Sequence, residues 1–313
     1  MPYIISKIIS QTRKKYIDTS QKMCYFIFTD VNFSGCTLFI LIFNKWKEIA
    51  MEYTLLRTEI VRRIGVITLN DPPKNAFSKR MLKEMLAILD EFEANDTVRC
   101  VFLKSTGEHF SQGADANDIR KALAGEVEEI PESFSELGGQ LVERIDCYPK
   151  PTIVAAKGRC IGGSTAVFNA FDVRIVGESF NIHDGDIYYG TVGSWGMSSL
   201  RLPIWIGRNR IMDYMFLNEG FSGRQAYELG IASKVVADEL VDGVGMHYAN
   251  KMSMAAPVAV RYFKECVRKA TASYLEEARK FELEAAEAVF ATQDSKDGLT
   301  YLLRGEQAEF QGK

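Results

Sequence analysis

The sequence contains little of what metal and disulfide sites are made from. Only three histidines occur in 313 residues, and His109, His183 and His247 share no helical spacing. A histidine-based metal site is therefore not expected. The six cysteines are scattered and form no C-x-x-C pair, which favours reduced thiols over a disulfide framework. We expect no metal ion and a cytoplasmic location.

Excess positive charge and long apolar runs are also missing. The net charge of −3 gives no sign of a nucleic-acid-binding surface. Residues 33–43 form an apolar stretch that is too short to span a bilayer. We therefore expect neither nucleic acid nor a membrane as a partner. The hydrophobic share of 47% and the charged share of 25% are ordinary for a globular protein.

Residues 1–50 differ in character from the rest of the chain. Residues 4–16 are basic and mixed, and the apolar stretch follows without the charge order of a signal peptide. We expect Met51 to be the natural start and residues 1–50 to be an N-terminal extension outside the fold. A membrane-surface anchor is the alternative for this segment.

The rest of the chain alternates between strand and helix patterns. Residues 59–70 predict a β-hairpin with Gly65 at its turn, and Ser78 is placed to cap an amphipathic helix. A buried strand at residues 98–104 then completes a βαβ pattern, which favours a parallel sheet covered by helices. From residue 257 the pattern is almost entirely helical. We expect an α/β core at residues 51–255 and a helical region at residues 256–313.

Two segments repeat the order strand, glycine turn, helix. They are Phe110–Asp115, which follows the strand at residues 98–104, and Cys160–Ser164, which follows a strand at residues 152–156. The N–H groups at the start of a helix can bind a phosphate, a carboxylate or a developing oxyanion. The alternative explanation is that glycine is needed there only to make the bend. If the two strands are neighbours, the turns lie side by side at the carboxyl edge of the sheet.

An ordered set of motifs resembles the crotonase (enoyl-CoA hydratase/isomerase) superfamily over roughly residues 54–310. The motifs are Lys74-Asn75-Ala76, Phe110–Asp115, Lys150–Ala156, Gly158, Gly162-Gly163, Phe171–Arg174, Arg201-Leu202-Pro203, Gly207 and Phe221–Gly230. The resemblance implies an α/β fold built as a spiral of ββα units, with a helical C-terminal part that packs in trimers. It implies an enzyme of the hydratase/isomerase type that works as a homotrimer or a dimer of trimers.

The resemblance also implies a substrate and part of a site. The substrate would be an acyl-CoA thioester, and no cofactor would be needed beyond the coenzyme A of the substrate. The N–H groups of Ala114 and Gly163 would hold the thioester oxygen and stabilise an enolate. The stretch Ala114-Asp115-Ala116-Asn117 would lie against CoA. Lys74 is a candidate for the CoA phosphates, with a solvated surface lysine as the alternative.

The acids are where this sequence departs from the family. Hydratases carry a glutamate three residues after the second glycine of the turn, and that position is Ala166 here. The family's second acid corresponds to Asp184 or Asp186, depending on how the loop is aligned, and we favour Asp186. A polar Asp-Gly turn is the alternative for both, and His183 is a possible helper.

The departure leaves several reactions open. A single carboxylate suffices to shift a double bond, whereas hydration uses two. Isomerisation and hydration are therefore the first candidates, followed by hydrolysis or decarboxylation, and a non-catalytic binding subunit is a different class. Ser194 is expected to cap a helix, with orienting water or substrate as the alternative. Tyr188, Tyr189 and Trp195 either line an acyl pocket or simply pack.

Overall fold

The computed structural model describes residues 53–126, 130–272, 275–306 and 310–311. The predictions for residues 1–50 lie outside these ranges. Within the described residues, no helix combines the length and apolar character needed to cross a bilayer.

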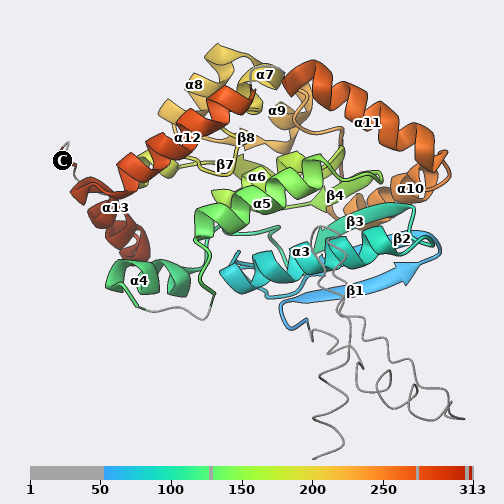
Figure 1. Cartoon of the computed structure of the whole chain (residues 1–313), viewed down its shortest axis with the longest axis horizontal. Helices are drawn as coiled ribbons and strands as arrows, with labels where there is room; N and C mark the ends of the chain where they lie inside the picture. Colours follow the sequence, from blue (N-terminus) through green and yellow to red (C-terminus); the bar gives the residue numbers. More distant parts are fainter. Residues whose placement is uncertain (1–52, 127–129, 273–274, 307–309, 312–313) are drawn as a thin grey trace, which may run out of the picture. The chain divides into compact units, whose positions relative to one another are not determined.

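The fold is built on a six-stranded sheet with the strand order β1-β2-β3-β4-β6-β9 (Figure 1). Strand β1 is antiparallel to β2, and every later pair of neighbours is parallel. The strands are β1 (Leu56–Val61), β2 (Ile64–Leu69), β3 (Cys100–Ser105), β4 (Thr152–Ala156), β6 (Val173–Gly177) and β9 (Lys234–Val236). The predicted α/β class with a largely parallel sheet is confirmed.

A second, three-stranded sheet has the order β5-β7-β8. It consists of β5 (Arg159–Ile161), β7 (Asn181–His183) and β8 (Phe221–Ser222). Strand β5 was not predicted, because three residues next to a glycine turn are too few to show an alternating pattern. This small sheet carries both the second glycine turn and the start of the acidic loop.

Helices cover both faces of the six-stranded sheet. Alternate residues of β2, β3 and β4 belong to two separate buried clusters, as period-two strands between two helical layers require. Helices α3 (Lys79–Ala94), α5 (Phe134–Asp146) and α6 (Gly163–Ala170) contribute to the larger cluster, and α10 (Val241–Met252) contributes to the smaller one. The cap at Ser78 is confirmed, since its side chain accepts from the Met81 N–H at 3.1 Å.

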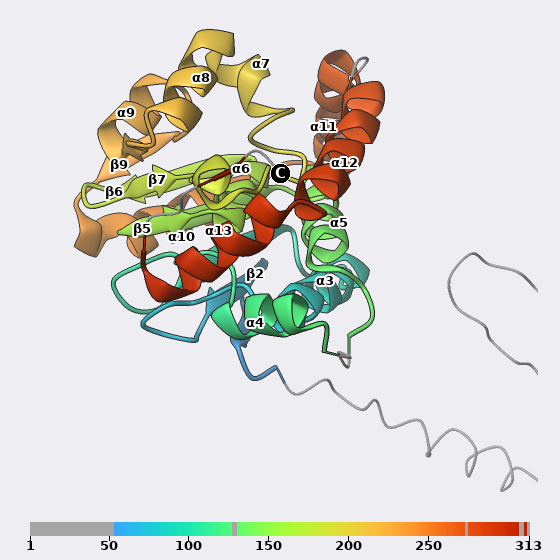
Figure 2. The same ribbon diagram turned by 90° about the vertical axis from the view of Figure 1, so that its left-hand side faces the viewer.

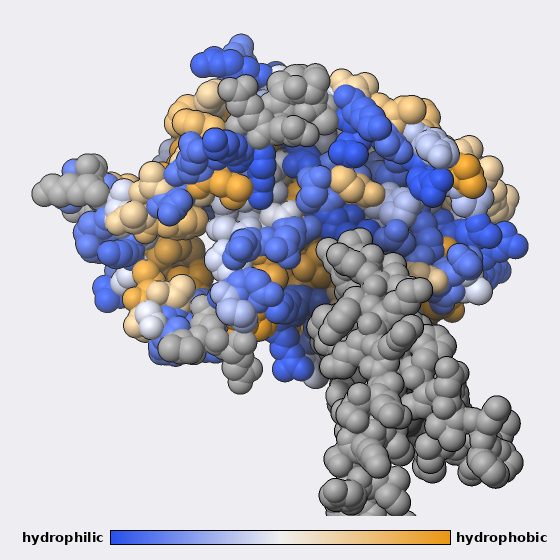
Figure 3. All heavy atoms as spheres, viewed as in Figure 1, coloured by the Kyte–Doolittle hydropathy of each residue, from blue (hydrophilic) through white to orange (hydrophobic). Residues whose placement is uncertain are grey.

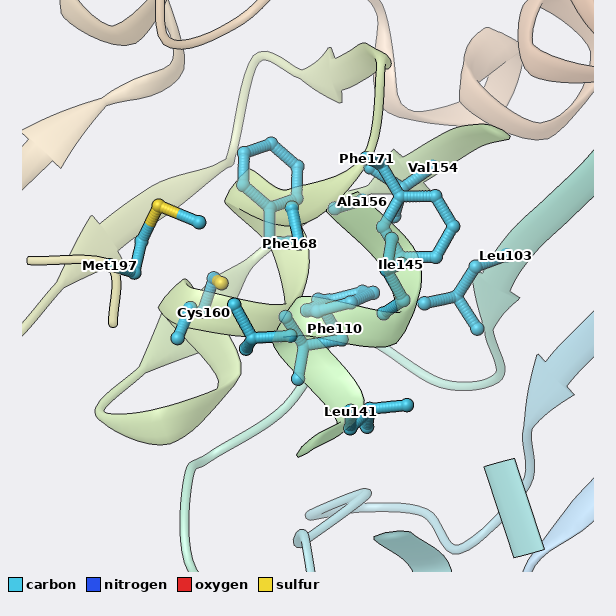
Figure 4. Packing of buried hydrophobic residues seen from close by; sticks show 14 of the residues in the cluster. Leu103, Phe110, Leu141, Ile145, Val154, Ala156, Cys160, Phe168, Phe171 and Met197 are labelled. Atoms are coloured by element: carbon cyan, nitrogen blue, oxygen red, sulfur yellow. The ribbon is translucent and has the colours of Figure 1, made fainter. Parts of the chain in front are cut away.

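The larger cluster includes Phe110 and Cys160, one residue from each of the two glycine-turn segments (Figure 4). Phe110, from the first turn, packs edge-on against Phe168 of α6 with ring centroids 6.0 Å apart. Cys160 of β5 and Met197 lie in the same cluster. Packed interiors resist displacement, so this core fixes the backbone of both turns.

The prediction that Gly65 forms the hairpin turn is wrong. The turn lies at Arg62, which has a positive φ of 58°, and Gly65 is inside strand β2. A Cβ on Gly65 would lie 2.5 Å from the ring of Phe92. Glycine therefore serves there to let helix α3 approach the sheet closely.

Figure 2 shows the remaining helices around the two sheets. They are α4 (Ala116–Ala124), α7 (Leu202–Ile206), α8 (Arg208–Phe216), α9 (Gly223–Glu228), α11 (Pro257–Ala272), α12 (Leu275–Phe290) and α13 (Gln293–Arg304), with 3-10 turns η1 (Asp186–Tyr189) and η2 (Asp238–Leu240). Helix α13 packs on η1 and beside α4. The predicted C-terminal helical part is confirmed, and apolar side chains appear at the surface over these helices in Figure 3.

Candidate active site

The two glycine turns lie side by side, as predicted. Strand β3 is the parallel neighbour of β4, and the segments beyond them continue to pair. The Ser111 N–H donates to the Arg159 carbonyl at 3.0 Å, and the Ile161 N–H donates to the Ser111 carbonyl at 3.2 Å. A Cβ on Gly113 would lie 2.9 Å from the Ile161 carbonyl oxygen, so glycine is what permits this contact between the two turns.

The first turn presents the N–H of Ala114. Gly113 has a φ of 89°, which favours glycine. The Phe77 N–H donates to the Gly113 carbonyl at 2.8 Å, and the Asp115 N–H donates to the Phe77 carbonyl at 2.9 Å. In such a parallel bridge the residue between the two bonded groups directs its own N–H to the other side. No acceptor within the described ranges receives the Ala114 N–H.

The second turn presents the N–H of Gly163. Gly162 has a φ of 56° and a ψ of −132° and precedes helix α6. Gly163 is the first residue of that helix, where a backbone N–H has no partner inside the helix. The Gly162 N–H donates to the His183 carbonyl at 3.0 Å. This hydrogen bond joins the turn directly to the residue that precedes Asp184.

Trp195 covers the second turn. The nearest atom of its ring is 2.7 Å from the position that a Cβ on Gly163 would take. Another ring atom is 1.8 Å from the position of a Cβ on Gly138 in α5. The ring contacts Phe134 and Phe77, with centroids 5.0 Å and 6.5 Å away. Trp195 is thus a buried wall residue beside the Gly163 N–H.

The prediction that Ser194 caps a helix is wrong. The next helix is α7, which begins eight residues later at Leu202. The Ser194 hydroxyl instead bonds to the Ser135 hydroxyl at 2.8 Å. Its carbonyl accepts from the Arg279 guanidinium at 2.7 Å. These contacts tie the segment that carries Trp195 to α5 and α12.

The other predicted CoA-binding residues surround the first turn. Asp115 caps α4, and its carboxylate accepts from the N–H groups of Asn117 at 2.9 Å and Asp118 at 3.2 Å. Ala116 opens that helix. Lys74 is exposed, and its carbonyl accepts from the Gln112 N–H at 2.9 Å. Contact with CoA stays a prediction for these residues.

Asp184 and Asp186 form a coupled pair. Asp184, just after β7, is 2% exposed. It accepts hydrogen bonds from the Ser198 hydroxyl and, at 3.3 Å, from the Asp186 N–H. Asp186 is only partly buried, and its Oδ2 is the nearest side-chain atom to the Cβ position of Gly193. Asp184 is therefore the inner carboxyl and Asp186 the outer one.

Burial and mutual repulsion favour one shared proton. Burial raises the pKa of Asp184, against the opposing effects of the Ser198 hydrogen bond and the nearby His183. Burial and the charge of Asp184 raise the pKa of Asp186 well above its usual range. Two carboxyls this close cannot both ionise cheaply. The pair therefore favours holding one proton between the two carboxyls.

The side chain of His183 is already engaged by a neighbouring residue. Its Nε2 lies 2.6 Å from the Asn218 side-chain oxygen and 3.1 Å from the Asn218 carbonyl. This nitrogen is therefore occupied by Asn218, whose backbone has a positive φ of 56°. His183 acts on the pair through its charge, which lowers the pKa of Asp184.

Two further polar residues at the pair were not predicted. Ser198 donates to Asp184, and the buried phenol of Tyr214 on α8 lies within the electrostatic reach of both aspartates. Neither residue stands in a motif, and only the folded chain brings them to the loop. Ala166, by contrast, is buried on α6 as an alanine, and that helix contributes no acid.

One group of potential metal ligands occurs in the described part of the chain, away from the turns. Glu143, Asp146 and Cys147 have ligand atoms close together. The Arg201 guanidinium already bonds the two carboxylates, each at 2.9 Å. The cation of this cluster is therefore the arginine.

Comparison with known proteins agrees with the motifs. The enoyl-CoA hydratase/isomerase family profile matches residues 59–313. A "Probable enoyl-CoA hydratase" of Bacillus subtilis is 28% identical over 251 residues, which are 80% of this chain and 96% of the relative. A 1,2-epoxyphenylacetyl-CoA isomerase of Escherichia coli is 26% identical over 264 residues, covering 84% of this chain and 100% of the relative.

A solved structure supports the same fold. The enoyl-CoA hydratase/isomerase of Pseudoalteromonas atlantica superposes with a TM-score of 0.74 at 21% identity, covering 82% of this chain and 100% of its own. The chain belongs to the enoyl-CoA hydratase/isomerase family and is an acyl-CoA-processing enzyme of the hydratase/isomerase type.

Proposed function

We propose that the enzyme forms a thioester enolate held by the N–H groups of Ala114 and Gly163, with the Asp184–Asp186 pair moving the proton. The observation that carries this proposal is the hydrogen bond from the Gly162 N–H to the His183 carbonyl, at 3.0 Å. It fixes the acidic loop to the same turn that presents the Gly163 N–H. Fixed donors and a proton carrier thus belong to one rigid unit.

The chemistry follows from the charge state of the pair. The ionised carboxylate takes a proton from the carbon next to the thioester carbonyl, and the electron pair moves onto the thioester oxygen. Each N–H that holds this oxygen lowers the barrier by about 3 kcal/mol. The carboxylic acid then returns a proton to another carbon of the enolate, and the double bond shifts. Asp186 is the outer carboxyl, so it faces the substrate.

This charge state favours isomerisation over hydration. An isomerase needs only a carboxylate that accepts a proton from one carbon and returns it to another, and the pair supplies that group. Hydration needs in addition a group that activates water, and α6 brings Ala166 at the family's glutamate position. Hydration is therefore the second candidate, with hydrolysis or decarboxylation behind it.

The same proposal includes the remaining substrate and assembly features. The stretch Ala114–Asn117 and the exposed Lys74 would bind CoA, since both border the first turn. The apolar surface of α11 and α12 would pack against the same surface of other copies in a trimer or a dimer of trimers. The protein would act in the cytoplasm without a further cofactor.

The test is an activity panel of 2-enoyl-, 3-enoyl-, β-keto- and malonyl-type CoA thioesters. We expect double-bond shift between the enoyl thioesters, and a loss of about 10²-fold or more in kcat for Asp186→Asn. Asp184→Asn should lose less, because the outer carboxyl remains. Thioester binding without turnover by the wild type would instead indicate a non-catalytic subunit. If a genuine activity survives both substitutions unchanged, the pair is not the proton carrier.

A further inference from the structure

Tyr214 carries a buried hydroxyl with no partner among the described residues. It lies on α8, and its side chain is 2% exposed. Within the described ranges, no hydrogen-bond acceptor or donor reaches its oxygen. The ring stacks on Phe221 with centroids 4.8 Å apart and an angle of 20°. This stacking fixes the direction in which the hydroxyl points.

The ring lies beside the strand that leads into the acid pair, because Phe221 of β8 pairs with Ile182 of β7, two residues before Asp184. The charges of Asp184 and Asp186, together with Cys160, act on the phenol, and burial is the largest of the effects that raise its pKa well above 10. The hydroxyl of Ser164, near Cys160, donates a hydrogen bond to the Ile161 carbonyl at 2.7 Å. The phenol therefore stays neutral and acts as a hydrogen-bond donor, not as a base.

A buried Tyr214 hydroxyl without a hydrogen bond, close to the acid pair, indicates a ligand. A buried hydroxyl without a partner is costly to the folded protein, and such groups are retained where a bound molecule completes them. In the proposed reaction, the molecule nearest the acid pair is the acyl group of the substrate. A carboxylate there would be repelled by negative charge on the pair, whereas a neutral oxygen would accept the phenol's hydrogen.

We propose that the Tyr214 hydroxyl binds an uncharged oxygen, a hydroxyl or keto group, on the acyl chain of the substrate. Tyr214 is then the residue that selects an oxygen-bearing acyl-CoA over a plain alkyl one. This inference rests on the proposed acyl-CoA function and adds the substrate's substituent to it. Phe221 holds the ring and is a positioning residue for the same contact.

The test measures binding, so it does not depend on turnover. Calorimetry would compare hexanoyl-CoA, its 3-hydroxy, 3-keto, 5-hydroxy and 5-keto derivatives, and adipyl-CoA. We expect the wild type to bind at least one neutral oxygenated thioester about tenfold more tightly than hexanoyl-CoA, and adipyl-CoA least tightly. Tyr214→Phe should erase that preference and leave hexanoyl-CoA binding unchanged. Tyr227→Phe, which removes an exposed phenol on α9, is the control and should keep the preference.

The outcomes separate the two proposals. If no thioester binds, the acyl-CoA proposal and this inference both fail. If the wild type binds all thioesters equally, the inference fails while the acyl-CoA proposal stands. If folded Tyr214→Phe, checked by circular dichroism, loses affinity equally for every thioester, Tyr214 shapes the pocket without reading an oxygen. The wild-type comparison alone decides the matter if the variant does not fold.

Discussion

At the scale of single residues, Asp184 and Asp186 lower the stability of the folded protein because they hold a proton for the reaction. Burial raises both pKa values, and the charge of Asp184 raises that of Asp186 further. A folded protein that holds a proton more tightly than its unfolded chain is stable at low pH and loses that advantage as pH rises. Each unit by which the pKa is raised corresponds to about 1.4 kcal/mol. Function and stability therefore oppose each other at these two positions.

Asp186→Asn should remove this cost. The amide imitates the protonated carboxyl at every pH, so the variant should become more stable relative to the wild type as pH rises from about 4 toward 8. Urea unfolding at pH 4.5, 6 and 7.5 would measure the difference. Asp96→Asn, at an exposed position, is the control and should show no such trend. A constant difference across pH would show that Asp186 is ionised in the folded protein.

Gly163→Pro tests the second donor. Proline is tolerated at the first position of a helix but has no N–H. Gly163→Ala is the matched control, because it adds the same Cβ against the Trp195 ring, 2.7 Å away, and keeps the N–H. We expect the proline variant to lose roughly 10²–10³-fold more kcat than the alanine variant. Equal losses would mean that the steric contact, and not the N–H, accounts for the effect.

The residues of the site differ in how far the sequence revealed them. Ala114 and Gly163 follow recognisable strand-turn-helix patterns, and the structure places those turns in contact. The sequence left Asp184 and Asp186 as alternatives, whereas the structure places them together as an inner and an outer carboxyl. Tyr214 could not be foreseen, since a tyrosine in an amphipathic helix is ordinarily a core residue, and its unpartnered hydroxyl exists only in the folded chain.

At the scale of elements, the contact between α3 and β2 depends on the absence of a Cβ at Gly65. Gly65→Ala would place a Cβ 2.5 Å from the Phe92 ring, which should destabilise the protein by roughly 1–3 kcal/mol in urea unfolding. Gly243→Ala is the control, since a Cβ there meets nothing within 4 Å on helix α10. It should stabilise by up to about 1 kcal/mol. Stability unchanged by Gly65→Ala would show that α3 can move away from the sheet.

Helices and strands differ in how well their positions can be predicted from the sequence. Long amphipathic helices such as α3, and buried strands such as β3 and β4, show clear periodicity and were placed within a few residues. The hairpin turn was misplaced because glycine is typical of both turns and close approaches, and only the position of Phe92 distinguishes them. Short strands such as β5 take their pairing from neighbours distant in sequence, which a local pattern does not contain.

At the scale of the whole molecule, the C-terminal helices keep apolar side chains uncovered. Phe263 on α11 and Phe281 on α12 are 70% and 71% exposed. Met254, just before α11, is exposed as well. Large apolar groups in solvent favour association, because burying apolar surface contributes about 25 cal/mol per Å². Covering these helices by other copies of the chain is consistent with the trimer that the family resemblance implies.

Light scattering after size-exclusion chromatography would measure this assembly. We expect a mass three or six times that of one chain for the wild type, falling toward one chain in Phe263→Glu and Phe281→Glu, since a buried unpaired charge opposes association. Phe216→Glu is the matched control, because Phe216 is equally apolar and 61% exposed but lies on α8. It should leave the mass unchanged. A wild type that elutes as one chain would contradict the assembly, and dissociation by Phe216→Glu alone would place the interface on α8.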